Sequence, residues 1–204
     1  MNKSCKVVEA ERVAEIAPKR AKLVFSVLIK NWHHKAKEQD DDFSKFVFEY
    51  LAFIAFLRKY KFIEQIKDRP LIQKIKCDIA LKEKYIDKIK TIPSLSADWK
   101  YVSEELNRKP LSNASYNQSP DELKWWNCSY EHSENQSQLE KEKRKGVIHS
   151  LEDWENMVEF WYIVRNNLFH GAKDPENERD QFAVEYGYKT LSVLVRVMIE
   201  EEVV

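Results

Sequence analysis

An arginine and a histidine near the C-terminal end of the chain have side chains that can cut RNA. They are Arg165 and His170, five positions apart in the stretch Arg-Asn-Asn-Leu-Phe-His-Gly. A guanidinium can neutralise the charge of a phosphorane, and an imidazole can move protons near neutral pH. The two together can split an RNA phosphodiester without a metal ion. Because such pairs also arise by chance, the surrounding sequence has to support this interpretation.

The sequence around this pair predicts an amphipathic helix that ends at the histidine. Ser150 is predicted to begin the helix, with Asp153 three residues further on in a variant of the capping box. Gly171 fits the position that stops a helix, because glycine accepts the left-handed conformation found there. The residues that share one face, at alternating steps of four and three, are Trp154, Val158, Trp161, Arg165 and Leu168. Arg165 is therefore predicted to lie inside the apolar stripe.

An arginine in an apolar stripe needs a partner, and two interpretations stay open. The first is an ion pair with a buried acid, for which Glu49 is the obvious candidate because it lies in the most apolar run of the chain. The second is a catalytic role. Asn166 could then orient the imidazole of His170, since the two lie at i and i+4 on one helix face. His170 could also serve only as a cap of the helix C-terminus.

Glycine and proline are rare, which predicts an all-α protein. The chain has three glycines and six prolines in 204 residues, and helix-forming residues are abundant. Its 34 basic and 34 acidic residues give no net charge. A non-specific nucleic-acid coat is therefore not expected, and any RNA contact has to be a local patch.

An antiparallel bundle of about five main helices is predicted, as a single domain over residues 1–204. The helices cover about residues 9–35, 43–66, 70–90, 150–170 and 179–202. The second, apolar nearly all round, is expected at the centre of the bundle, and Asp68 is expected to cap the third. Residues 93–146 contain prolines and many polar residues. They are predicted to form a partly irregular insertion between bundle helices, with short helices near residues 98–107 and 139–145.

Cysteine usage and hydropathy favour a cytoplasmic protein without a membrane segment. Three widely spaced cysteines do not suit a disulfide framework and fit a reducing compartment. No apolar signal segment is visible near the N-terminus. The longest apolar run, Phe46 to Leu57, is too short to span a bilayer.

The stretch from Tyr162 to Gly171, followed by an acidic loop and a long amphipathic helix, resembles the HEPN superfamily. The signature of that family is an arginine, a polar residue, a few further positions and a histidine at a helix end. Arg165, Asn166 and His170 match this pattern position by position. The resemblance is sharpest over residues 150–198. It implies a helical bundle that dimerises through the motif helices and, in many members, a metal-independent endoribonuclease.

The resemblance also implies roles for the three motif residues. His170 would be the general acid or base, Arg165 would hold the phosphate charge of the transition state and Asn166 would orient the reacting groups. The products would be 2′,3′-cyclic phosphate and 5′-OH ends, formed without a cofactor or a metal. The expected partners are RNA, a second copy of the chain, and an antitoxin or other regulatory protein of a toxin or antiphage effector. The apolar stripe of the motif helix would form either the dimer contact or part of the bundle's own core.

Other residues give weaker signals and leave an alternative function open. Because some relatives are inactive, the alternative is a non-catalytic helical module that binds a nucleotide or a protein partner. Trp125 and Trp126 lie among polar residues and could stack unpaired RNA bases or pin an irregular loop onto the bundle. The spacing of Cys128 and His132 could begin a zinc site, but no second Cys/His pair follows, so no metal is expected. The neighbouring histidines at 33–34 are expected on the surface.

Overall fold

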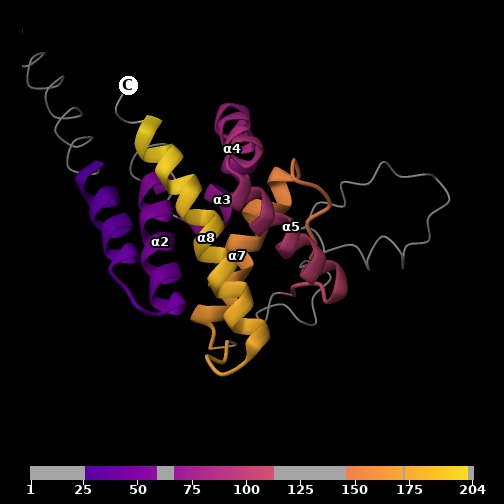
Figure 1. The fold of residues 1–204 in the computed structure, drawn as a ribbon. Helices are drawn as coiled ribbons and strands as arrows, with labels where there is room; N and C mark the ends of the chain where they lie inside the picture. The colour runs from indigo at the N-terminus through magenta and orange to yellow at the C-terminus, as the bar shows by residue number, and fades with distance from the viewer. Residues whose placement is uncertain (1–25, 59–66, 113–145, 172, 202–204) are drawn as a thin grey trace, which may run out of the picture.

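The described residues of the chain form a bundle of helices (Figure 1). A computed structural model describes residues 26–58, 67–112, 146–171 and 173–201, and within these ranges it contains seven helices and no strand. The helices are residues 26–37, α2 (Asp42–Phe56), α3 (Asp68–Lys76), α4 (Ile79–Thr91), α5 (Pro93–Arg108), α7 (Trp154–Phe169) and α8 (Glu178–Glu201). The predicted all-α bundle is confirmed.

The motif helix α7 lies at the centre of this bundle. Twelve of its 16 residues are buried, so no side of it faces solvent along most of its length. It packs against α3 and α8, and aromatic ring contacts join it to α2 and α5. The apolar stripe with Trp154, Val158 and Trp161 is completely or almost completely buried in the bundle itself. Of the two alternatives for that stripe, the structure therefore places it in the core.

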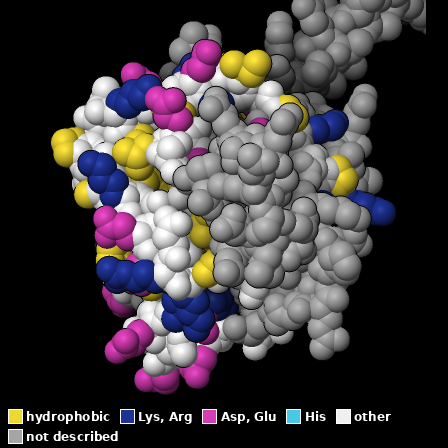
Figure 2. All heavy atoms as spheres, turned by 90° about the vertical axis from the view of Figure 1, so that its right-hand side faces the viewer, with side chains coloured by type: hydrophobic (Ala, Val, Ile, Leu, Met, Phe, Trp, Pro, Cys, Tyr) yellow, Lys and Arg dark blue, Asp and Glu magenta, His cyan; other side chains and the backbone are white. Residues whose placement is uncertain are grey.

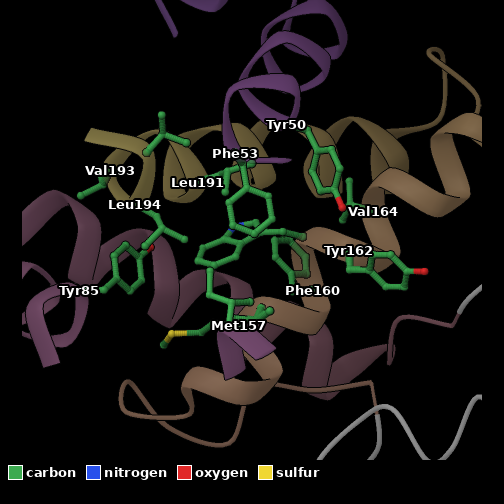
Figure 3. Close-up of a cluster of buried hydrophobic side chains, with 14 of the residues drawn as sticks. Tyr50, Phe53, Tyr85, Met157, Phe160, Tyr162, Val164, Leu191, Val193 and Leu194 are labelled. Atoms are coloured by element: carbon green, nitrogen blue, oxygen red, sulfur yellow. The ribbon is translucent and has the colours of Figure 1, made fainter. Parts of the chain in front are cut away.

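Aromatic side chains fill the core around one tryptophan of α7. The ring centroids of four neighbours lie between 5.6 and 6.4 Å from that of Trp161: Phe53, Tyr85, Trp99 and Trp154. Figure 3 shows Phe53, Tyr85 and Phe160 around this cluster. The indole Nε1–H of Trp161 donates to Oγ1 of Thr190 on α8 at 2.8 Å. Because the buried indole N–H has a partner, the large apolar ring is buried without leaving an unsatisfied donor.

A glycine allows α2 and α8 to approach closely. Figure 1 shows the two helices side by side. A Cβ atom at Gly187 would lie 3.0 Å from Cε2 of Phe46, which is tighter than nearly all real contacts. On its other side α2 packs against residues 26–37, where the rings of Trp32 and Phe48 stack at 5.6 Å. α2 is therefore covered on two sides, but the central position that its apolar run predicted is held by α7, because 7 of the 15 residues of α2 are buried against 12 of the 16 of α7.

Aspartate side chains cap the beginnings of two helices. Asp41 is the N-cap of α2 and its side chain accepts from the N–H of Ser44 at 2.8 Å. Asp78 accepts from the N–H of Leu81 at 3.0 Å and begins α4. This cap splits the predicted third helix into α3 and α4. α7 begins at Trp154, four residues later than predicted.

The predicted insertion at residues 93–146 is wrong in its first part, because α5 is a full helix of the bundle. Its 16 residues bury one side chain per turn, at Leu95, Trp99, Val102 and Leu106. Pro93 occupies the first turn, where a missing N–H costs no helix hydrogen bond. Proline was therefore a start signal here and not an interruption. Residues 113–145 lie outside the described part of the chain.

The visible described surface carries both signs of charge. Figure 2 shows basic and acidic side chains intermixed over that part of the face, in keeping with the zero net charge of the sequence. A positively charged site therefore has to come from a local grouping of residues. Every helix in the described ranges is too short or too polar to cross a lipid bilayer.

Candidate functional site

α7 ends at the motif histidine, as the sequence predicted. Phe169 is its last residue and His170 is the C-cap. Gly171 has a φ of 67°, the left-handed conformation that glycine adopts without strain. The N–H of His170 donates to the carbonyl of Asn166 at 3.0 Å, and that of Gly171 to the carbonyl of Leu168 at 3.1 Å. The side chain of His170 is exposed, so its imidazole is open to solvent.

Arg165 lies one turn before this end, and its guanidinium is held from several sides. Nη2 lies 3.3 Å from Oδ2 of Asp68, and Nη1 donates to Oδ1 of Asn166 at 2.9 Å. The guanidinium carbon lies 4.9 Å from the ring centroid of Phe169 and 5.8 Å from that of Tyr50. Even so, 26% of the side chain is exposed. The arginine is thus fixed in place and still reachable from solvent.

Asn166 supports Arg165 and is itself buried. Its amide oxygen is the acceptor for the guanidinium. Among the hydrogen bonds of the described residues, none joins Asn166 to the imidazole of His170, so the predicted orienting contact is not observed. The adjacent Asn167 donates to the carbonyl of Ser112 at 2.8 Å. Asn166 therefore fixes Arg165, and Asn167 fixes the backbone at Ser112 beside α7. Among the described residues, the side chain of His170 forms no hydrogen bond with either amide.

Glu49 is not the partner of Arg165, and this prediction is corrected. Its Oε1 lies 2.7 Å from Nδ1 of His33, and both side chains are buried. Adjacent helix positions differ by about 100° around the axis. Tyr50 is the position of α2 that meets Arg165, and Glu49 is rotated from it toward residues 26–37. His33 is consequently a buried residue and not a surface one, whereas His34 is exposed as expected.

Replacing Glu49 by glutamine is expected to change stability in a way that depends on pH. Burial raises the pKa of the Glu49 carboxyl, although its hydrogen bond with His33 acts in the opposite direction. A raised pKa in the folded state means that the wild type loses stability as pH rises from the unfolded value through the folded one. The glutamine does not titrate. As the pH rises from about 4, E49Q should therefore gain free energy of unfolding relative to the wild type.

Urea unfolding at several pH values measures this difference. Glu104→Gln removes an exposed carboxyl of α5 and serves as the matched control. A constant difference between E49Q and the wild type over this pH range would contradict a raised pKa at Glu49.

Asp68, at the beginning of α3, joins Arg165 to a second arginine. The predicted role of Asp68 as a cap is wrong, because Lys67 is the N-cap and no side chain caps this helix. Oδ1 of Asp68 accepts instead from Nη2 of Arg58, which follows α2, and Oδ2 faces Arg165. Asp68, Arg58 and Phe169 were not predicted as site residues. Phe169, 55% exposed beside the arginine, adds an aromatic face to the site.

A second ion-pair cluster adjoins this one inside the bundle. Glu159 of α7 is fully buried and pairs with Arg69, at 2.7 Å between Nη1 and Oε1, and with Lys76. The guanidinium of Arg69 also lies 5.2 Å from the ring centroid of Tyr162. Burial lowers the pKa of Lys76, while Glu159 acts in the opposite direction. This cluster anchors α3 on α7 and so fixes the position of Asp68.

Several predicted residues lie outside the described ranges. These are Trp125, Trp126, Cys128 and His132. Within the ranges that are described, no group of three or more histidine, cysteine or acidic side chains could hold a metal ion.

The chain was compared with family models, curated proteins and solved structures, and none of them matches it. The resemblance to HEPN proteins therefore rests on the motif residues themselves.

Proposed function

We propose that the protein is a metal-independent endoribonuclease of the HEPN type. The observation that carries the proposal is the pairing of a fixed, partly exposed Arg165 with an exposed His170 at the end of one buried helix. A guanidinium held before substrate arrives needs little rearrangement to meet developing charge. An imidazole in solvent can exchange its proton in each cycle.

The reaction proposed is an internal transfer within the RNA. The ribose 2′-OH loses its proton to a base and attacks the adjacent phosphorus. The bond from phosphorus to the 5′-oxygen breaks, and that oxygen takes up a proton. His170 serves in the proton transfers and Arg165 stabilises the phosphorane. The products are a 2′,3′-cyclic phosphate and a 5′-OH end.

Asn166 has a positioning role in this proposal, because it holds the guanidinium of Arg165. Phe169 offers an exposed ring beside the same guanidinium, on which a base next to the scissile phosphate can stack. Trp125 and Trp126 remain candidates for further base contacts.

The homodimer is also part of the proposal. Arg165 and His170 are five residues apart, about 140° around a regular helix, so a second copy would help to bring both groups to one phosphate. Because the apolar stripe of α7 lies in the core, the pairing would use the exposed end of α7. A toxin or antiphage role, with a neutralising protein partner, fits an unregulated RNA-cutting activity.

Purified protein is expected to cut single-stranded or looped RNA in the presence of EDTA. The same sequence in DNA should stay intact, because the mechanism needs the 2′-OH as nucleophile. Product ends can be read by treatment with a phosphatase that acts on cyclic phosphates and by 5′-labelling with a kinase. Activity that disappears with chelator and returns with Mg²⁺ or Mn²⁺ would rule out this mechanism.

The second candidate is a non-catalytic module that binds a nucleotide or a protein partner. It is favoured by the ion pair between Arg165 and Asp68, since a structural arginine also has such a partner. In that case the protein would bind a nucleotide or a protein partner without turnover, and neither the wild type nor His170→Ala would cleave RNA.

A further inference from the structure

Two arginines from different parts of the chain face the two oxygens of one carboxylate. Arg58, after α2, binds Oδ1 of Asp68, and Arg165, near the end of α7, lies 3.3 Å from Oδ2. The three side chains are 39%, 26% and 17% exposed for Arg58, Arg165 and Asp68, respectively. We call this group the arginine clamp. It lies at the boundary between the core and solvent.

The surroundings of the clamp carry more positive than negative charge. The adjacent cluster adds Arg69 and Lys76, together with the carboxylates of Glu159 and, near Lys76, Glu155. Counting the clamp as well, four cationic side chains are accompanied by three carboxylates, a net charge of +1. In a protein of zero net charge, this is a local excess that favours an anion.

A buried hydroxyl beside the clamp is not used by the described protein groups. Tyr50 is 3% exposed, and its ring lies 5.8 Å from the guanidinium carbon of Arg165. Its hydroxyl has no hydrogen-bond partner among the described residues. Figure 3 shows this side chain near Val164, the residue before Arg165. Burial raises the pKa of Tyr50, so the phenol keeps its proton and remains a hydrogen-bond donor.

Two guanidinium groups that face the two oxygens of one anion suit a phosphodiester as well as a carboxylate. A phosphodiester presents two non-bridging oxygens that share one negative charge, as the two oxygens of a carboxylate do. Guanidinium groups recognise both kinds of anion through pairs of N–H···O bonds. The Asp68 carboxylate thus occupies the place that a backbone phosphate of RNA could take between the same two arginines.

We propose that Arg58 and Arg165 together bind a phosphate of the RNA backbone, and that Asp68 is a resident competitor which this phosphate displaces. The proposal deepens the ribonuclease function and rests on it for the identity of the ligand. It assigns a binding role to Arg58. It also explains how Arg165 can pair with Asp68 in the free protein and still bind RNA, because the carboxylate occupies the place of the RNA phosphate.

Neutralising the competitor should strengthen RNA binding. In the Asp68→Asn variant two guanidinium groups face each other without a counter-charge, and a phosphate relieves their repulsion. D68N should therefore bind RNA about tenfold more tightly than the wild type. Arg58→Ala should bind about tenfold more weakly, because one half of the clamp is lost. D68N should also show a steeper loss of affinity with salt, because in this variant the phosphate displaces salt anions from the two guanidinium groups, whereas in the wild type it displaces Asp68.

The test uses full-length protein and a fluorescent single-stranded RNA with 2′-O-methyl riboses, which lacks the nucleophile and stays intact. Fluorescence anisotropy gives the affinity at several salt concentrations. Asp87→Asn on α4 and Arg108→Ala on α5 change exposed residues of the same types and are the matched controls. Circular dichroism verifies that each variant is folded, and R58A D68N provides a second test of Arg58 in which the resident acid is absent.

Tighter binding by D68N together with weaker binding by R58A, relative to their controls, is the expected result. Equal affinities for D68N and D87N would overturn the proposal, as would equal affinities for R58A and R108A. If D68N does not fold, unchanged binding by R58A overturns it alone. Cleavage of ordinary RNA is measured separately. Tighter RNA binding by D68N without any cleavage would support the clamp proposal and contradict the ribonuclease proposal. Cleavage without these binding changes would contradict only the clamp proposal.

Discussion

Replacing His170 by alanine is expected to lower the rate of RNA cleavage by about 10²–10⁴-fold and to leave the fold intact. The imidazole is exposed at the C-cap, so its loss removes a proton-transfer group without opening a cavity. The backbone hydrogen bond from His170 to Asn166 does not need the side chain. Cleavage rates at saturating RNA, with thermal unfolding of the same samples, measure the two effects separately.

His34→Ala is the control for this change, because it removes another exposed histidine at a distant helix. Arg165→Ala should lower cleavage to a similar degree. Its cost in stability should be only about 1–2 kcal/mol, because Asp68 keeps Arg58 as a partner. The catalytic account fails if H170A cuts RNA as fast as H34A, or if it loses activity only because it unfolds.

Replacing Trp161 by alanine is expected to lower the free energy of unfolding by about 4–5 kcal/mol. The side chain is fully buried among four other aromatic rings. Its removal leaves a cavity that the helices cannot fill, and it leaves Thr190 without the indole donor. Urea unfolding followed by circular dichroism measures the loss. The loss is a large fraction of the about 5–15 kcal/mol that domains of this size have in total, so the variant should unfold at a clearly lower urea concentration than the wild type.

Trp161→Phe separates the two contributions. The smaller ring keeps most of the apolar contact but cannot donate to Thr190, so the cost should be about 1–3 kcal/mol. Tyr101→Ala removes an aromatic ring of α5 that is 43% exposed and should cost less than W161A. Equal losses for W161A and Y101A would show that Trp161 does not have the central place described above.

The sequence contained enough information for the fold class and for the end of the motif helix. Rare glycine and proline predicted helices, and Gly171 predicted the end of α7 because few residues accept its positive φ. It also indicated which face of α7 is apolar. It could not decide whether that face packs against a second copy or against the chain itself. That choice depends on how many helices surround α7, which periodicity does not encode.

The errors arose where one residue type has two structural uses. The prolines of residues 93–146 predict an interruption, but Pro93 lies in the first turn of α5, a position to which proline is equally suited. Asp78 capped a new helix within what looked like one continuous pattern. In both cases the local signal was present in the sequence, and its meaning depended on whether the following residues could be buried.

The partner of Arg165 could not be identified from local sequence. Glu49 was the predicted partner because it lies in the most apolar run of the sequence, but Asp68 forms the ion pair with Arg165. The difference is a rotation of one residue on α2, which turns Tyr50 toward the arginine and Glu49 toward residues 26–37. Such a rotation is set by the packing of α2 on α7 and α8, among residues more than 100 positions apart along the chain. Pattern arguments act over one or two helical turns and do not reach that far.

The burial of α7 on all sides also affects how genetic screens of this protein should be interpreted. Its first three turns stabilise the bundle, and its last turn carries the residues proposed for chemistry. A selection that scores only loss of activity in cells would therefore enrich substitutions along the whole helix. Most of them would act by lowering protein abundance. If activity is divided by the amount of folded protein, only substitutions in the last turn should still show a loss. The positions that show this loss would then define the extent of the site.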